Sequence, residues 1–411
     1  MKMPGKTILK QVYGESVQSM ARFARLAEGY RENFKREQAA FFSAPGRTEM
    51  IGNHTDHNGG KVIAASIDLD TIGAAWPNDS TEIRIVSEGY GETVVELTAL
   101  ADVEKVSGTK ALLAGIAEGT RHFGYKVSGF DAYLSTNVIS AAGVSSSASM
   151  EMLICAMVNA FFNEGAMSCA DYAKIGQYAE NVYWKKASGQ MDQMACAVGG
   201  AVLLNFADKN AVEYKKTSLD LDRFGYQMVI VNTGKGHADL SGDYSAVPQE
   251  MNEVARALGV NRLCETTEDA LLANLPELNN DRALLRAFHF FEENKRVEAA
   301  AAAIEAQDLN TLLALLDASG KSSWEWLQNC YTTTGWQDQK ITLALALTAL
   351  FLQKAGAGIC RVHGGGFAGV IQCVLPQSLV ADYCAYIARY VGEKNIYPVQ
   401  VRATGAVCLS D

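Results

Sequence analysis

The chain has 411 residues, of which 48% are hydrophobic and 20% charged, and its net charge is −10. Because this length exceeds the size at which a single core stops growing, we expect two domains. The negative charge argues against nucleic acid or an acidic membrane surface as a partner. Nine scattered cysteines and an N-terminus without an apolar signal core are typical of a cytoplasmic protein with reduced thiols. The longest apolar run, residues 341–352, is too short to span a membrane.

Hydrophobic periodicity predicts the elements of the first half in chain order. An amphipathic helix opens the chain at residues 15–37. The predicted strands that follow cover residues 39–43, 61–75, 82–87, 92–97, 129–137 and 201–206. The predicted helices between them cover residues 109–123, 150–162 and 170–185.

A polar connection near residues 210–225 is where we place the domain boundary, which gives domains of 1–218 and 219–411. Beyond it, a strand is predicted at 226–232, and residues 358–375 have the pattern strand, glycine turn, strand. The predicted helices of the second half cover residues 244–258, 281–293, 297–305, 321–329 and 339–355. A last helix and a strand at 399–408 close the chain.

Residues 138–151 read V-I-S-A-A-G-V-S-S-S-A-S-M-E and lie between a predicted strand and a buried helix. Small side chains let a ligand approach the backbone, and the first N–H groups of a helix are unpaired donors at the positive end of its dipole. This arrangement favours a phosphate-binding loop. The alternative is a flexible Ser/Gly connector with a serine N-cap. The G-K-S at residues 320–322 is not a Walker A motif, because Leu315 stands where the first glycine belongs.

The densest polar cluster is residues 44–60, A-P-G-R-T-E-M-I-G-N-H-T-D-H-N-G-G. It gathers the donors and acceptors that hold a polyhydroxylated ligand. Two alternatives remain open: a turn with Asx caps, and a metal site at His54 and His57 beside Asp56.

Two further segments carry weaker signals. Residues 189–193, G-Q-M-D-Q, place one aspartate among small and apolar residues, where it is either an N-cap or a functional carboxylate. Residues 363–369, H-G-G-G-F-A-G, form either a plain hairpin or a loop that faces a ligand.

Taken together and in this order, the four segments resemble the galactokinase branch of the GHMP kinases. The first motif of that family is commonly A-P-G-R-V-N-L-I-G-E-H-T-D-Y-N-G-G, and residues 44–60 match it at twelve of seventeen positions. The family's S-S-S-A-S aligns with residues 145–149, its G-I-M-D-Q with 189–193 and its G-G-G-F-G-G with 364–369. A fifth match is S-G-D-Y at 241–244, where the family often has S-S-E-Y.

The resemblance implies an α+β fold of the two-domain GHMP kinase type. Its N-terminal domain would resemble ribosomal protein S5 and its C-terminal domain would be ferredoxin-like, with the active site in the cleft between them. The implied reaction is phosphorylation of the anomeric C1 hydroxyl of a galacto-configured sugar, with galactose as the leading substrate and ATP and Mg²⁺ as cofactors. We expect a monomer whose partners are the sugar and ATP.

The resemblance also implies the site residues. Asp192 would act as base or electrostatic partner at the hydroxyl, Arg47 would lie across the transferring phosphoryl group, and Ser147 would contact magnesium. The implied sugar-binding residues are Glu49, Asn53, His54, Asp56, Gly189 and Tyr244. The implied ATP-binding residues are Ala142, Gly143, Val144, Ser145, Ser146, Ser147, Ala148, Ser149, Gly365 and Gly366. An arginine, a helix N-terminus and an aspartate are the set that phosphoryl transfer requires.

The departures from the family pattern fall in the sugar motif. Asn53 replaces the glutamate that contacts the C6 hydroxyl in galactokinases, which favours a substituted C6 as in galacturonate. Yet Glu49 stands where the family has asparagine, so the pair is reversed and, if the turn is helical, the two share a face. This exchange favours an ordinary neutral hexose. A non-catalytic sugar sensor is the alternative of another class, against which the complete S-S-S-A-S and Asp192 argue.

Overall fold

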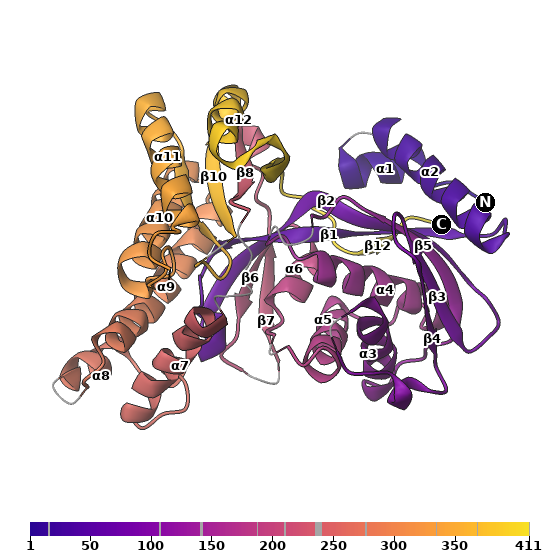
Figure 1. The fold of residues 1–411 in the computed structure, drawn as a ribbon, viewed down its shortest axis with the longest axis horizontal. Helices are drawn as coiled ribbons and strands as arrows, with labels where there is room; N and C mark the ends of the chain where they lie inside the picture. Colours follow the sequence, from indigo (N-terminus) through magenta and orange to yellow (C-terminus); the bar gives the residue numbers. More distant parts are fainter. Residues whose placement is uncertain are drawn as a thin grey trace.

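The computed structural model describes residues 1–14, 17–106, 108–139, 143–186, 188–208, 211–234, 241–275, 278–333, 335–367 and 369–410. Two β-sheets, each covered by helices, lie side by side (Figure 1). Of the residues that the sequence assigns to a site, Ala142 lies outside the described residues. None of the described helices is long and apolar enough to cross a membrane. The nine cysteines all belong to the described part of the chain and form no disulfide there.

The larger sheet has eight strands in the order β12-β1-β2-β5-β3-β4, with β6 and β7 continuing from β2. The sheet branches at the long strand β2, because residues 71–77 of β2 pair with β5 and residues 61–65 pair with β6. The strands are β1 (Ala40–Ile51), β2 (Lys61–Pro77), β3 (Glu82–Ser87), β4 (Glu92–Glu96), β5 (Phe130–Thr136), β6 (Ala201–Asn205), β7 (Glu213–Thr217) and β12 (Val407–Cys408).

Helices cover both faces of this sheet (Figure 1). On one face lie α1 (Lys6–Tyr13) and α2 (Val17–Phe34), and on the other lie α3 (Thr109–His122), α4 (Ser146–Phe162), α5 (Cys169–Tyr178) and α6 (Met191–Val198). Helix α4 is buried because its residues are almost all small or apolar, and Met152 and Leu153 pack with Phe42 and Leu134 of the sheet. The sheet therefore supports the helices whose N-termini reach the candidate site.

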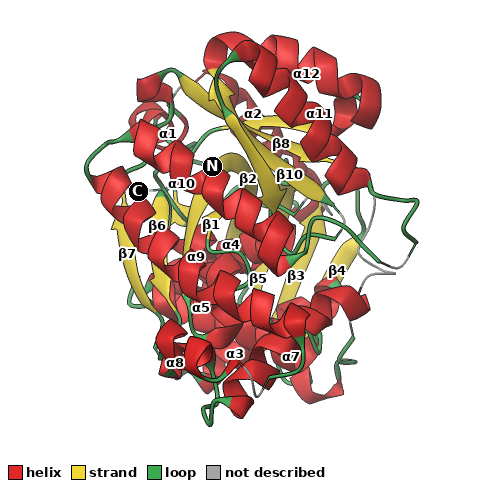
Figure 2. Ribbon diagram, turned by 90° about the vertical axis from the view of Figure 1, so that its left-hand side faces the viewer, coloured by secondary structure: helices red, strands yellow, loops and turns green. Residues whose placement is uncertain are grey.

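The smaller sheet has the antiparallel order β11-β8-β10-β9, from strands β11 (Ile396–Val399), β8 (Tyr226–Asn232), β10 (Val370–Pro376) and β9 (Ile359–His363). Alternate residues of β8 face opposite sides, as strand geometry requires. Met228 and Ile230 pack in the core shared with α9 (Asp281–Glu305), α10 (Leu309–Ser322) and the larger sheet. Val229 and Val231 face α11 (Lys340–Ala355) and α12 (Gln377–Val391), which lie over the outer side (Figure 2). The remaining helices are α7 (Ser241–Ala257) and α8 (Glu268–Ala273).

Several sequence predictions of element boundaries were wrong. The strand predicted at 39–43 extends as β1 to Ile51, so Arg47 and Glu49 lie in a strand rather than a turn. Strand β7 was missed because four of its five residues are exposed and show no apolar alternation. The helix predicted at 15–37 is confirmed as α2, whereas α1 before it was not predicted. The helices predicted at 281–293 and 297–305 are one helix, α9. The helix predicted at 321–329 belongs instead to α10 and the π-turn Ser323–Leu327 that follows it.

The strands change sheet between β7 and β8, close to the predicted boundary at 218/219. The chain end returns to the larger sheet, because β12 pairs with β1 and Ile67 bridges Val401. Strand pairing does not establish which parts fold independently, so the division into 1–218 and 219–411 stays a prediction.

Candidate active site

One cavity of about 600 Å³ collects the segments that the sequence singled out. Its walls come from β1, the turn after it, the start of the phosphate loop, the segment before α6, α7 and the glycine turn after β9. Ten of the predicted site residues line it: Arg47, Glu49, Asn53, His54, Asp56, Gly143, Gly189, Asp192, Tyr244 and Gly365. The cavity is also lined by residues that the sequence did not assign to a site, among them Glu180, Lys186 and His363.

Strand β1 reaches the phosphate loop through Gly46. A Cβ at this position would lie 2.7 Å from the backbone oxygen of Val144, so only glycine allows the approach. The backbone N–H of Arg47 then donates to the Val144 carbonyl, with 3.1 Å between nitrogen and oxygen. This contact joins the first sequence motif to the second.

Arg47 and Asp192 form the central ion pair of the cavity. The guanidinium Nε donates to Oδ1 of Asp192 over 2.8 Å, and Nη1 donates to the Gly143 carbonyl. Ser145 donates its hydroxyl proton to the other carboxylate oxygen, Oδ2. Burial acts to raise the pKa of Asp192, but the charge and hydrogen bond of Arg47 outweigh it and hold the pKa below its usual value. The carboxylate is therefore ionised and fixed in orientation at neutral pH.

The phosphate loop leads directly into α4, which begins at Ser146. Ser145 is the N-cap in the left-handed region, with φ of 57°, and its hydroxyl bonds Asp192 instead of capping the helix. The first N–H groups of α4 thus keep their capacity to bind an anion. The side chains of Val144, Ala148 and Ser149 are buried in the protein, so any contact they make with a nucleotide would come from the backbone.

Ser147 faces a pair of charged residues that sequence reasoning missed. Its hydroxyl donates to Oε1 of Glu180 over 3.2 Å, and Lys186 donates to the same oxygen over 2.9 Å. Glu180 lies on the π-turn Ala179–Tyr183 after α5 and is only 2% exposed. No sequence signal separates it from the other acidic residues of a predicted helix, since only the tertiary packing brings it to the loop.

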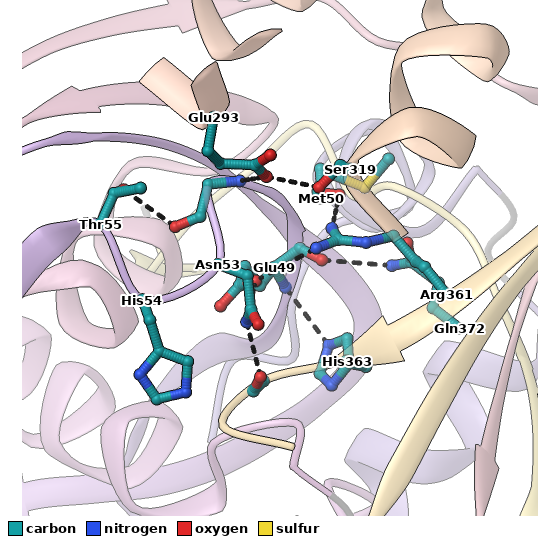
Figure 3. Close-up of polar contacts among 12 residues, drawn as sticks. Glu49, Met50, Asn53, His54, Thr55, Glu293, Ser319, Arg361, His363 and Gln372 are labelled. Atoms are coloured by element: carbon teal, nitrogen blue, oxygen red, sulfur yellow. Dashed lines mark hydrogen bonds and ion pairs between the residues drawn. The ribbon is translucent and has the colours of Figure 1, made fainter. Parts of the chain in front are cut away.

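The turn after β1 is held by Asn53, which is 1% exposed. Its Nδ2 donates to Oε1 of Glu49 over 2.8 Å and to the Gly364 carbonyl over 2.6 Å (Figure 3). Its Oδ1 accepts from Nδ2 of Asn329 over 2.6 Å. The backbone carbonyl of Asn53 lies 2.9 Å from Nε2 of His289 on α9. The predicted pairing of Glu49 with Asn53 is confirmed, although Glu49 lies on a strand and not on a helical turn.

The remaining sugar-motif residues surround the same cavity. His54 Nε2 lies 2.9 Å from the Gly365 carbonyl, and burial lowers the pKa of His54 to about 4, so the ring is neutral and Nε2 is the donor. The Tyr244 ring lies 5.2 Å from the ring of His54. Gly189 lies against Asp56, whose Oδ2 would be 3.1 Å from a Cβ at that position.

The glycine turn at residues 364–366 lies beside the predicted sugar contacts. A Cβ on Gly365 would meet the Tyr244 ring at 2.2 Å, and one on Gly366 would meet the backbone oxygen of Asn329 at 2.2 Å. Their assignment to ATP binding stays a prediction. The metal alternative for His54, Asp56 and His57 gains no support, because no group of three or more His, Cys, Asp or Glu side chains among the described residues could hold a metal ion.

Comparison with known proteins bears on what this arrangement does. Residues 28–77 match the galactokinase galactose-binding signature, and residues 111–200 match the N-terminal domain of GHMP kinases. A galactokinase of Limosilactobacillus fermentum is 33% identical over 377 residues, covering 90% of this chain and 92% of the relative. A galactokinase of Limosilactobacillus reuteri is 30% identical over 384 residues, covering 90% and 94%.

Solved structures agree. The galactokinase of Lactococcus lactis, complexed with galactose, has a TM-score of 0.80 at 26% identity and covers 94% of this chain and 99% of its own. A mevalonate kinase of Methanococcus jannaschii has a TM-score of 0.62 at 16% identity, covers 89% of this chain and 99% of its own, and shares the fold. The predicted two-domain GHMP kinase fold is thus confirmed, and the sensor and galacturonate alternatives are not favoured. The chain belongs to the galactokinase family within the GHMP kinases and is a sugar kinase.

Proposed function

We propose that this chain transfers the γ-phosphoryl group of ATP to the anomeric C1 hydroxyl of galactose and yields galactose 1-phosphate. The observation that carries the proposal is the Arg47–Asp192 pair, which joins a sugar-type polar cluster to a serine-lined helix N-terminus in one cavity. The galactose in the Lactococcus lactis structure supports galactose as the substrate. Glu49 also supports a neutral sugar, because a buried carboxylate in the cavity would repel a uronate.

Each member of the pair has a distinct role in the proposed reaction. Asp192 orients the C1 hydroxyl and takes its proton as the bond to phosphorus forms, since a fixed carboxylate is suited to accept a hydrogen bond from the attacking group. Its low pKa favours the orienting role. Arg47 lies beside the start of the phosphate loop, where its guanidinium would stabilise charge on the transferring oxygens. The N–H groups at the start of α4 would bind the ATP phosphates.

Mg²⁺ fits the residues that surround Ser147. Magnesium in kinase sites is held by one or two protein oxygens together with substrate phosphates. Ser147 and Glu180, whose side-chain oxygens lie 3.2 Å apart, supply such a pair next to the loop. Bound there, the ion would neutralise charge on the phosphate oxygens of ATP. Lys186, which donates to the same Glu180 oxygen, would keep that carboxylate oriented before ATP binds.

The enzyme is proposed to act as a cytoplasmic monomer without nucleic acid. The segments that the proposed reaction needs meet in one cavity of this chain, which supports a monomer. The net charge of −10 disfavours nucleic acid, and cysteines that form no disulfide in the described part of the chain suit a reducing compartment.

A panel of free sugars with ATP and Mg²⁺ tests the proposal. ADP release and the carbon that carries phosphate are measured for galactose, glucose, mannose and galacturonate. We expect turnover of galactose with phosphate on C1 and none of galacturonate. Asp192→Asn is the matched control for contaminating kinases, because it keeps shape and removes only the charge. Absence of ADP release with galactose, or phosphate on another carbon, would contradict the proposal.

A further inference from the structure

The exchanged pair Glu49 and Asn53 raises the question of which side chain contacts the sugar. Asn53 has no donor to offer, because both hydrogens of Nδ2 are used by Glu49 and by the Gly364 carbonyl. Its Oδ1 accepts from Asn329, and the residue is 1% exposed. The hydrogen-bonding groups of the Asn53 side chain are therefore occupied by other protein groups rather than left for a ligand.

Glu49 is different, because only one of its oxygens is engaged. Oε1 accepts from Asn53 over 2.8 Å and lies 3.7 Å from Nη2 of the buried Arg361 (Figure 3). Among the described residues the hydrogen bond to Glu49 uses Oε1, and Oε2 is not one of the buried side-chain atoms that lack a partner, so Oε2 is open to the cavity that Glu49 lines. A carboxylate oxygen that is open to the cavity can accept a hydrogen bond from a hydroxyl of a bound ligand.

The position of Glu49 along β1 indicates which part of a sugar it reaches. Residues 47–49 pair with 64–66 in regular register, and the irregularities of β1 lie on either side of them. Arg47 and Glu49 therefore point to the same face, with about 6.7 Å between their Cα atoms. Arg47 holds Asp192 at the phosphoryl-transfer end of the cavity. Glu49 is thus placed to meet hydroxyls on the opposite side of a sugar ring.

We propose that Glu49, rather than Asn53, is the specificity-determining residue that hydrogen-bonds the sugar hydroxyl at the end of the ring away from C1. Asn53 is the positioning residue that fixes Oε1 and turns Oε2 toward the ligand. The ligand class is a neutral hexopyranose with a hydroxyl at C4 or C6 in reach of this oxygen. This inference rests on the proposed function.

Deoxy sugars test the assignment by removing the partner from the ligand instead of from the protein. The kinetic constants kcat and KM are measured for galactose and for its 2-, 3-, 4- and 6-deoxy analogues, with wild type and Glu49→Gln. Loss of a buried hydrogen bond justifies an expected rise of about 10- to 100-fold in the galactose KM of Glu49→Gln, with a smaller change in kcat. This difference in KM between wild type and Glu49→Gln should vanish for either the 4-deoxy or the 6-deoxy analogue. It should persist for the 2- and 3-deoxy analogues.

Asn53→Ala separates positioning from direct contact. Acting through Glu49, it should raise the galactose KM in the wild-type background and add little in the Glu49→Gln background, because the two changes remove one interaction. The matched control is Glu37→Gln, since Glu37 has a 72% exposed side chain that pairs with Arg31 on the surface. This control should leave every constant unchanged. The KM for ATP and the melting temperature establish that each variant is folded.

The outcomes are distinguishable. If wild type does not turn over galactose, the proposed function and this inference both fail. If wild type is active but Glu49→Gln keeps its galactose KM within about twofold, the inference alone is overturned. It is also overturned if Glu49→Gln raises the KM equally for all five sugars. Full additivity of the effects of Asn53→Ala and Glu49→Gln on the galactose KM would overturn it as well.

Discussion

Asp192 and Glu49 are two carboxylates in one cavity, and the protein holds them in opposite ways. Asp192 accepts hydrogen bonds from Nε of Arg47, over 2.8 Å, and from the hydroxyl of Ser145. These contacts lower its pKa despite burial. Glu49 has an amide as its hydrogen-bond partner and its nearest cation, Arg361, at 3.7 Å, so burial raises the pKa of Glu49 to about 7. A direct charge-assisted hydrogen bond outweighs desolvation, whereas a more distant cation does not.

The difference suits the proposed roles. The group at the reacting hydroxyl must be ionised and fixed, which the Arg47 contact achieves. The group at the far end of the sugar needs only to exchange hydrogen bonds with a neutral hydroxyl. Near neutral pH it can accept a hydrogen bond when ionised and donate one when protonated. Substitutions that act on one carboxylate and spare the other therefore distinguish the two roles.

The largest effect is expected for Asp192→Asn. The change keeps the shape of the side chain and removes the charge that orients or accepts the hydroxyl proton, so kcat should fall about 10²- to 10⁴-fold. Steady-state assays with galactose measure kcat, while titration with ATP and Mg²⁺ establishes that the nucleotide site persists. A variant that keeps a large part of the wild-type kcat would remove Asp192 from the mechanism.

Glu49→Gln should change how stability depends on pH. The pKa of Glu49 is 4.5 when unfolded and about 7 when folded, so its contribution to stability is full below pH 4.5 and is lost as pH rises through 7. Glutamine does not titrate and avoids this loss, which is on the order of 3 kcal/mol for such a shift.

Denaturant unfolding of wild type and Glu49→Gln at pH 5 and pH 8 measures this change. The variant should gain stability relative to wild type at pH 8. The charged groups that act on Glu49 are Arg361, Arg47 and Asp56, and all three are present in both proteins, so the difference isolates Glu49. An unfolding free-energy difference that does not vary with pH would contradict the raised pKa.

Arg47→Lys tests the other carboxylate. Lysine keeps the positive charge but loses the planar fork that reaches both Asp192 and the Gly143 carbonyl. Since the charge is retained, we expect kcat to fall by about 10- to 100-fold, less than complete loss of a transition-state donor would cause. The galactose KM should change less. A rise in KM alone would make Arg47 a contact of the bound sugar rather than of the transition state.

Much of the site was predictable because it depends on short motifs with chemical content. Residues from all four motif segments line one cavity, as their shared family pattern predicted, whereas the hydrogen bond between Arg47 and Asp192 was not predicted. The pairing of Glu49 with Asn53 was also predictable from their reversed order, although the expected helical turn was not. The strand ends at Ile51, and the turn that follows carries Asn53 back toward Glu49.

What the sequence could not predict depends on packing between distant segments. Glu180 reaches Ser147 from 33 residues away along the chain, by way of a π-turn after α5. Asn329, His289 and Gly364 hold Asn53 from the second half of the chain, and none of them belongs to a pattern that points to residue 53. The exposed strand β7 lacks the alternation by which strands are recognised.

The smallest effect, and the most specific, is expected from restoring the family order of the exchanged pair. Asn53→Glu removes two donors and juxtaposes two buried carboxylates, which resist ionising together. Glu49→Asn juxtaposes two amides and leaves Arg361 without its acid. Both changes together return one donor and one acceptor to the pair, so the double variant should recover part of the loss. Residues in contact typically couple by about 1–3 kcal/mol. A double-mutant cycle on the free energy of unfolding and on kcat/KM for galactose measures this coupling, and strict additivity in both would show that the two positions act independently.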